Sequence, residues 1–120
     1  MIKILLIDDE PNVIRGWRMR LALEDDLAVV GDARDPETAP LMARVTQPDV
    51  ILLDLMLTGR NGADLIPHLF KAAPGCRIIV VSIYDNAGNR YLALQAGAAA
   101  FVAKQESPET LLTTIRAVMA

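Results

Sequence analysis

The sequence predicts an α/β fold in which one five-stranded parallel sheet is covered by helices on both faces. Five short apolar runs alternate along the chain with five stretches of helical apolar spacing. Runs of Val, Ile and Leu without polar alternation are typical of parallel strands that are buried on both faces. Strands that alternate with helices indicate right-handed βαβ crossovers within a single sheet.

The five predicted strands are short and mostly built from Val, Ile and Leu. They are Lys3–Ile7, Ala28–Val30, Val50–Leu53, Ile78–Val81 and Ala100–Val102. The last run is the weakest strand pattern, because three alanines precede Phe101. The first run meets two aspartates at once, whereas a secretory signal needs a longer apolar region and a small-residue cleavage site, so we interpret it as a buried strand.

The first two helical patterns both begin beside a proline. The first starts at Pro11, a residue suited to the first helical position, and the second has Asp35 as its cap with Pro36 behind it. Pro40 lies inside the second pattern, where it lacks an N–H to donate, so we expect a late start or a bend there. The apolar positions in helical register are Ile14, Trp17 and Leu21 in the first pattern, and Leu41 and Val45 in the second.

The other three patterns follow the third, fourth and fifth strands. The third begins near Gly62, and the fourth covers roughly 87–96 with Gly97 as a left-handed stop. The fifth is capped by Ser107, and Pro108 follows at its first position. The positions expected to be buried are Leu65, Ile66 and Leu69 in the third pattern, and Leu111, Leu112, Ile115 and Val118 in the fifth.

Length and composition fit one compact domain over residues 1–120. Hydrophobic residues make up 52% of the 120 residues, which is enough for a buried core, and no apolar run approaches the roughly 18 residues of a membrane span. Cys76 is the single cysteine and has no partner for a disulfide or a zinc site, which favours the reducing cytoplasm. A net charge of −3 gives no electrostatic footprint for nucleic acid, so any DNA contact requires another segment.

Polar side chains follow four of the five predicted strands. Asp8 and Asp9 come after the first strand, Asp54 ends the third, Ser82 follows the fourth and Lys104 lies just past the fifth. Ligands of parallel α/β sheets bind beyond the carboxyl ends of the strands, so we expect these groups to converge at one edge.

Such a set of groups can support phosphoryl transfer. A divalent cation relieves the repulsion of clustered carboxylates, and Mg²⁺ prefers a few carboxylates together with phosphate oxygens. One carboxylate can attack phosphorus and form an acyl phosphate, while the cation, a lysine and hydroxyl or backbone donors neutralise the developing charge. Each residue alone also has an ordinary explanation, as a helix cap, a turn residue or a surface charge. Their joint occurrence at the strand ends favours the functional interpretation.

From Lys3 to about Val118, the chain resembles the receiver domain of bacterial two-component response regulators. Four motifs carry the resemblance, and together they are far more specific than any one alone. They are Ile7-Asp8-Asp9-Glu10-Pro11, Asp54-Leu55-Met56-Leu57-Thr58-Gly59-Arg60-Asn61-Gly62, Val81-Ser82-Ile83 and Phe101-Val102-Ala103-Lys104. The resemblance implies a doubly wound, flavodoxin-like fold with strand order 2-1-3-4-5.

The resemblance also implies a role for each motif residue. Asp54 would be the phosphoacceptor, Asp9 a direct Mg²⁺ ligand, Asp8 an acid that holds the metal largely through water, and the Met56 carbonyl a further ligand. Lys104 would pair with the phosphoryl oxygens. The remaining two implied roles belong to the switch. Ser82 would be the hydroxyl that turns toward the phosphoryl group, and Phe101 would be the aromatic ring that changes rotamer.

Three positions depart from the commoner family pattern. Leu57-Thr58 stands where the family often has Met-Pro, which should loosen the loop without touching a ligand side chain. Phe101 lacks the hydroxyl of the commoner tyrosine, so a switch here cannot use that hydrogen bond. Ser82 replaces the common threonine and can do the same work.

The resemblance implies a histidine kinase or phosphotransfer protein as partner, and a switch face made of the fourth helix, fifth strand and fifth helix that can pair two copies. Arg15-Gly16 and 29–33 are most similar to receivers attached to a helix-turn-helix output domain, so the chain can be a fragment that reaches DNA through a separate C-terminal domain. By the same resemblance, we expect this chain to act in the regulation of transcription and not to be an enzyme. Arg15, Arg18 and Arg20 form either a solvated face or a kinase-docking region.

Two other functions compete with this interpretation. A phosphorylation-independent interaction module could share the fold, but such modules usually lose an acid or the lysine, and both are present here. Aspartate-nucleophile phosphatases place a second acid two residues past the nucleophile, where this chain has Met56, so rapid turnover lacks its proton donor. Met56 and Tyr84 would instead hinder water and lengthen the phosphorylated lifetime.

Overall fold

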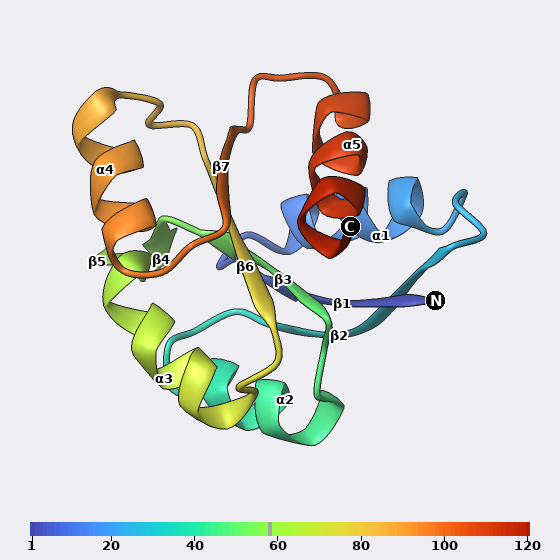
Figure 1. The fold of residues 1–120 in the computed structure, drawn as a ribbon, viewed down its shortest axis with the longest axis horizontal. Coiled ribbons are helices and arrows are strands. Elements are labelled where there is room, and N and C mark those ends of the chain that lie inside the picture. The colour runs from blue at the N-terminus through green and yellow to red at the C-terminus, as the bar shows by residue number, and fades with distance from the viewer. Residues whose placement is uncertain (58) are drawn as a thin grey trace.

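The computed structural model describes residues 1–57 and 59–120, and its centre is a five-stranded parallel sheet (Figure 1). The sheet strands are β1 (Ile2–Ile7), β2 (Leu27–Ala33), β3 (Val50–Asp54), β6 (Arg77–Ser82) and β7 (Ala100–Ala103). Their order is β2-β1-β3-β6-β7, which is the predicted order 2-1-3-4-5 once the sheet strands alone are counted. The predicted fold class and strand order are therefore confirmed.

The helices cover both faces of the sheet (Figure 1). They are α1 (Pro11–Leu21), α2 (Ala39–Thr46), the 3₁₀ turn η1 (Gly62–Leu65) that runs into α3 (Ile66–Ala72), α4 (Ala87–Gln95) and α5 (Pro108–Met119). One core layer joins the sheet to α2, α3 and α4, and the other joins it to α1 and α5. Within the described part of the chain, none of the helices combines the length and the apolar character needed to cross a membrane.

Residues of the central strands alternate between these two core layers. Leu5 and Leu53 face α2–α4, whereas Ile4 and Leu52 face α1 and α5. Each is at most 3% exposed, so both sheet faces are buried, as expected of a doubly covered parallel sheet.

The helix boundaries mostly follow the predictions. Pro11 opens α1 and Pro108 opens α5. Gly97 follows α4 with a φ of +113°, and the N–H groups of Gly97 and Ala98 donate to the carbonyls of Leu94 and Ala93. This pair of bonds is a Schellman motif, which confirms the predicted left-handed stop.

The second helix differs from the prediction at its apolar face. α2 starts late, at Ala39, as Pro40 suggested, and Asp35 caps the preceding turn through the N–H of Thr38. Leu41 and Val45, the predicted apolar positions, are 55% and 79% exposed. The helix turns the alanines 39 and 43 to the core instead, and small side chains allow it to lie close to the sheet.

The other predicted apolar positions lie in the core. Leu65, Ile66, Leu69, Leu111, Leu112 and Ile115 are buried, and Trp17 and Val118 are half-buried against the same layer as α1 and α5. An element that was not predicted is a small antiparallel ribbon of β4 (Met56–Leu57) and β5 (Arg60–Asn61), which follows Asp54. Thr58, where the acceptor loop departs from the family pattern, lies outside the described residues.

Candidate functional site

Four strands bring the predicted polar residues to one edge of the sheet. Asp8 and Asp9 follow β1, Asp54 is the last residue of β3, Ser82 is the last residue of β6, and Lys104 comes directly after β7. The parallel register pairs Asp54 with Val81 and Ser82 with Ala103, so these strand ends lie level with one another. Regular hydrogen bonding along the sheet therefore sets the positions of the side chains.

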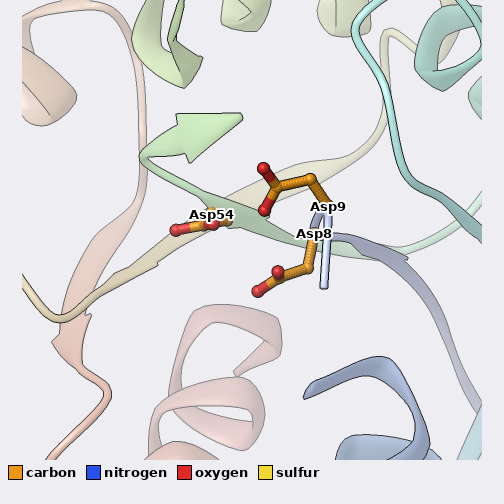
Figure 2. Close-up of side chains that lie close together, drawn as sticks. All are labelled: Asp8, Asp9 and Asp54. Carbon is orange, nitrogen blue, oxygen red and sulfur yellow. The ribbon is translucent and has the colours of Figure 1, made fainter. Parts of the chain in front are cut away.

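Three of the side chains form an acidic cluster (Figure 2). Asp8, Asp9 and Asp54 each offer a carboxylate oxygen, and these oxygens all lie within 4.8 Å of one another. Asp8 is 4% exposed and Asp54 is 8% exposed, while Asp9 is half-buried. Asp8 also accepts a 3.0 Å hydrogen bond from the backbone N–H of Glu10, at the start of α1.

The ammonium group of Lys104 lies between two of these acids. Its Nζ is 2.8 Å from Asp8 Oδ2 and 3.4 Å from Asp54 Oδ1. Three carboxylates around one ammonium leave an excess of negative charge, which a divalent cation would balance.

The acid–base properties of Asp54 and Lys104 reflect this crowding. Burial and the negative charge of Asp8 raise the pKa of Asp54 to about 6, even though Lys104 acts to lower it. Burial acts to lower the pKa of Lys104, but its contacts with Asp8 and Asp54 outweigh that effect, and the pKa lies above its ordinary value. At neutral pH Asp54 is therefore mostly ionised beside Asp8, and Lys104 relieves their repulsion only in part.

Ionisation of Asp54 should lower the stability of the metal-free domain. The folded chain binds this proton more tightly than the unfolded chain does, so the contribution of Asp54 to stability falls as pH rises from its ordinary pKa of 3.8 to about 6. Asp54→Asn should therefore be about 2 kcal/mol more stable than wild type at pH 7 and nearly equal to it at pH 4.

Chemical denaturation of both proteins in EDTA checks this expectation. Mg²⁺ should narrow the difference at pH 7, because the cation favours the ionised carboxylate. A stability difference that stays constant between pH 4 and pH 7 would contradict the assigned environment of Asp54.

Ser82 ends β6, the strand next to β3, and Phe101 lies in β7, the next strand of the sheet. Ser82 is fully buried, and its hydroxyl oxygen accepts a 2.9 Å hydrogen bond from the N–H of Tyr84. The carbonyl of Ser82 accepts from the N–H of Lys104 at 2.8 Å. Phe101 is buried in the core layer of α2–α4. The predicted switch residues are thus both inside the domain.

The segment after Asp54 turns back sharply to the strand end. The N–H of Met56 lies 3.4 Å from Asp54 Oδ1, and the N–H of Gly62 donates to the carbonyl of Leu55. A Cβ atom at Gly62 would collide with the carbonyl oxygen of Asp54 and would lie 3.0 Å from that of Leu55. Sequence reasoning assigned Gly62 only to a motif and a helix start, and missed that the acceptor turn has no room for a side chain there.

The donor set suits a hard divalent cation. Carboxylate oxygens are the ligands that Mg²⁺ prefers, and a half-buried Asp9 beside two buried acids leaves one side of the cluster accessible. The carbonyl ligand assigned to Met56 and the roles assigned to the individual acids stay predictions. What the structure shows is that the three carboxylates lie together, with a lysine beside them, at the end of β3.

The chain matches a known family model over most of its length. The model describes the response regulator receiver domain and matches residues 4–116. A nitrate/nitrite response regulator protein homolog from Haemophilus influenzae is 34% identical over 117 residues, which are 98% of this chain and 56% of that protein. The chain spans about half the length of the curated relatives it matches.

Solved structures show the same similarity. A LuxR-family two-component response regulator from Aurantimonas superposes with a TM-score of 0.92 at 30% identity, covering 99% of this chain and 85% of that one. A Burkholderia pseudomallei response regulator with a phosphorylated aspartic acid, a calcium ion and citrate has a TM-score of 0.80 at 28% identity, covering 99% of this chain and 71% of that one. Together with the fold, these matches show that the chain belongs to the response regulator receiver domain family.

Proposed function

We propose that this chain is a phosphorylation switch in which Asp54 accepts a phosphoryl group from a histidine kinase or a phosphotransfer protein. The observation that carries the proposal is the position of the Asp54 carboxylate, which lies close to the carboxylates of two other acids and to the ammonium of Lys104. The similar B. pseudomallei protein carries a phosphorylated aspartic acid together with a divalent cation, which supports the same chemistry here.

In the proposed transfer, a carboxylate oxygen of Asp54 attacks the phosphorus of a phosphohistidine. A new O–P bond forms, the P–N bond breaks, and the histidine nitrogen keeps the electron pair of that bond. The pKa of about 6 leaves Asp54 mostly ionised at neutral pH, as a nucleophile must be. The product is an aspartyl phosphate whose oxygens lie in reach of cationic and hydroxyl groups of the site.

Three acids and a backbone carbonyl are proposed to hold Mg²⁺: Asp8, Asp9, Asp54 and Met56. The cation would supply positive charge that offsets the acids and the transferred group. Lys104, which now contacts Asp8 and Asp54, can shift its ammonium to the phosphoryl oxygens. The hydroxyl of Ser82 uses a lone pair in its bond from Tyr84, so its proton can be donated to the same oxygens.

Phosphorylation is proposed to bias a two-state equilibrium of the domain. Ser82 and Phe101 would move, and the face of α4, β7 and α5 would change its affinity for a partner, including a second copy of the chain. Exposed apolar side chains on and before α4, among them Ile83, Tyr91 and Leu94, suit such a face. Because the matched relatives are about twice as long, we propose that 1–120 is one receiver domain and that a separate C-terminal domain contacts DNA to regulate transcription in the cytoplasm.

Kinase docking is proposed for a groove beside the site. The groove has a volume of about 320 Å³ and lies between α1 and the start of α5, where Trp17, Lys104 and Pro108 line it. Of the three arginines considered for docking, Arg18 pairs with Asp32 and Arg20 pairs with Glu24 and Glu109. These two side chains therefore also form ion pairs within the domain itself.

The proposal is tested by offering a small phosphodonor. Wild-type protein with acetyl phosphate and Mg²⁺ should gain about 80 Da, the mass of one phosphoryl group, in an intact-mass measurement. The gain should disappear with Asp54→Asn or with EDTA, and should persist with Asp64→Asn, which changes an exposed acid outside the cluster. Wild-type protein that gains no mass would instead favour a phosphorylation-independent interaction module.

The phosphorylated lifetime should depend on Met56. Its side chain is 38% exposed two residues past Asp54, and a thioether neither orients nor activates water. Met56→Asn supplies an amide that can hydrogen-bond to an attacking water, so loss of the phosphoryl group should become about tenfold faster, a barrier change of about 1.4 kcal/mol. The decay of the phosphorylated mass after removal of acetyl phosphate measures this rate, and equal rates for both proteins would remove the idea.

A further inference from the structure

Arg90, in the middle of α4, contacts two segments that flank the proposed switch. Its Nε donates to Asp85 Oδ1 at 2.5 Å, in the loop that joins β6 to α4. Its guanidinium carbon lies 4.8 Å from the centre of the Phe101 ring, and Nη1 is 3.5 Å from the Phe101 carbonyl oxygen in β7. One planar cation thus contacts the loop, the ring and the strand at once.

The loop that carries Asp85 is also tied to the Ser82 hydroxyl. The Ser82 oxygen accepts from the N–H of Tyr84, and the Tyr84 carbonyl accepts from the side chain of Asn89 at 2.9 Å. A second tie joins the carbonyl of Ile83 to the side chain of Gln105, which follows Lys104. If the hydroxyl turns toward a phosphoryl group while its oxygen keeps this bond, the Tyr84 N–H has to follow that oxygen, so the loop that holds Asp85 has to adjust.

We propose that Arg90 is a positioning residue that transmits this adjustment from Asp85 to the ring of Phe101. Phe101 has no hydroxyl with which to bond to the loop. The guanidinium of Arg90 connects the two instead, because it forms an ion pair with Asp85 of the loop and also contacts the Phe101 ring. The ion pair holds Arg90 over the ring and lowers the pKa of the Asp85 carboxyl. A loop shift that moves Asp85 therefore withdraws or reorients the cation above the ring. This inference rests on the proposed function.

The geometry also explains why an arginine serves here. A guanidinium can stack flat on a ring while its Nε and Nη groups donate to acceptors in its own plane. Arg90→Lys would keep a charge for Asp85 but lose the planar contact with Phe101. Arg90→Met would keep an apolar stem of similar length and lose both connections, so it is the sharper variant.

The test follows the ring of Phe101 by NMR in the full chain. The sequence has two phenylalanines, and Phe70, which touches the core near Gly97, is an internal reference. Labelled phenylalanine is observed before and after acetyl phosphate with Mg²⁺, and intact mass is measured on the same samples. In wild type we expect a shift of the Phe101 signals. In Arg90→Met we expect the mass gain to remain and most of that shift to be lost.

Two further variants keep the result interpretable. Asp85→Asn leaves Arg90 in place but removes its anchor on the loop, so it should lose the Phe101 response in the same way. Arg44→Met, an exposed arginine on α2, should respond as wild type does. Phosphorylated Arg90→Met and Asp85→Asn that shift the Phe101 signals as far as wild type, or a phosphorylated wild type whose Phe101 signals do not move, would overturn the inference. Wild type without a mass gain would instead reject the proposed function.

Discussion

Replacing Lys104 with methionine should lower the free energy of unfolding by about 3 kcal/mol at pH 7 in EDTA, because removing one partner leaves buried charges uncompensated. The Lys104 ammonium is 2.8 Å from Asp8 and 3.4 Å from Asp54, and all three side chains are largely buried. Urea denaturation measures the loss. It should shrink at pH 5, where Asp54 takes up a proton, and in Mg²⁺, where a cation replaces the lysine charge.

Two controls separate this effect from a general loss of charge. Lys71→Met removes an exposed lysine of α3 and should change the unfolding free energy by less than about 0.5 kcal/mol. Asp54→Asn combined with Lys104→Met should recover part of the stability, since one of the two acids that face the lysine is then neutral. A Lys104→Met protein as stable as wild type at pH 7 without metal would show that the lysine does not balance this cluster.

Gly62→Ala should disrupt the acceptor turn itself, with a destabilisation of about 3 kcal/mol, the upper end for overpacked sites. The added methyl group would meet the backbone carbonyls of Asp54 and Leu55, and a backbone atom cannot rotate away as a side chain can. Any relaxation has to shift the end of β3, which carries the acceptor. We therefore expect the variant to lose most of its phosphorylation by acetyl phosphate as well as stability.

Gly75→Ala is the matched control for this substitution. A Cβ atom at Gly75 would meet nothing within 4 Å, so the change in unfolding free energy should stay within about 0.5 kcal/mol. Denaturation curves and phosphorylated mass are compared for the two variants. A Gly62→Ala protein that matches Gly75→Ala in both measurements would contradict the close approach of the turn to β3.

Most of the fold could be predicted because the central strands have an unbroken apolar pattern. The strands β3 and β6 are buried on both faces over 50–54 and 78–82, so their unbroken apolar runs identify them. The face of α2 could not be predicted in the same way. Its register depends on the start of the helix at Ala39, between Pro36 and Pro40, and Ala39 and Ala43 contact the core while the larger Leu41 is exposed. The ribbon of β4 and β5 has two residues per strand, too few to show a period.

The convergence of the acids and the lysine could be predicted for a different reason. In a parallel sheet, residues at the carboxyl ends of strands meet at one edge, whatever their distance in sequence. The contribution of Gly62 depends on how tightly one turn folds back, and that of Arg90 depends on how α4 lies over β7. Neither of these close contacts produces a periodic pattern in the sequence, so neither could be predicted without the three-dimensional structure.

The most direct measurement identifies which residue carries the phosphoryl group. Protein treated with acetyl phosphate and Mg²⁺ is reduced with borohydride, which converts an aspartyl phosphate to homoserine, and the peptides are then sequenced by mass spectrometry. We expect homoserine at position 54, none at positions 8 and 9, and none anywhere when EDTA replaces Mg²⁺. Homoserine at position 8 or 9 instead, or an unmodified Asp54 in protein that has gained the phosphoryl mass, would contradict the assignment of Asp54 as the acceptor.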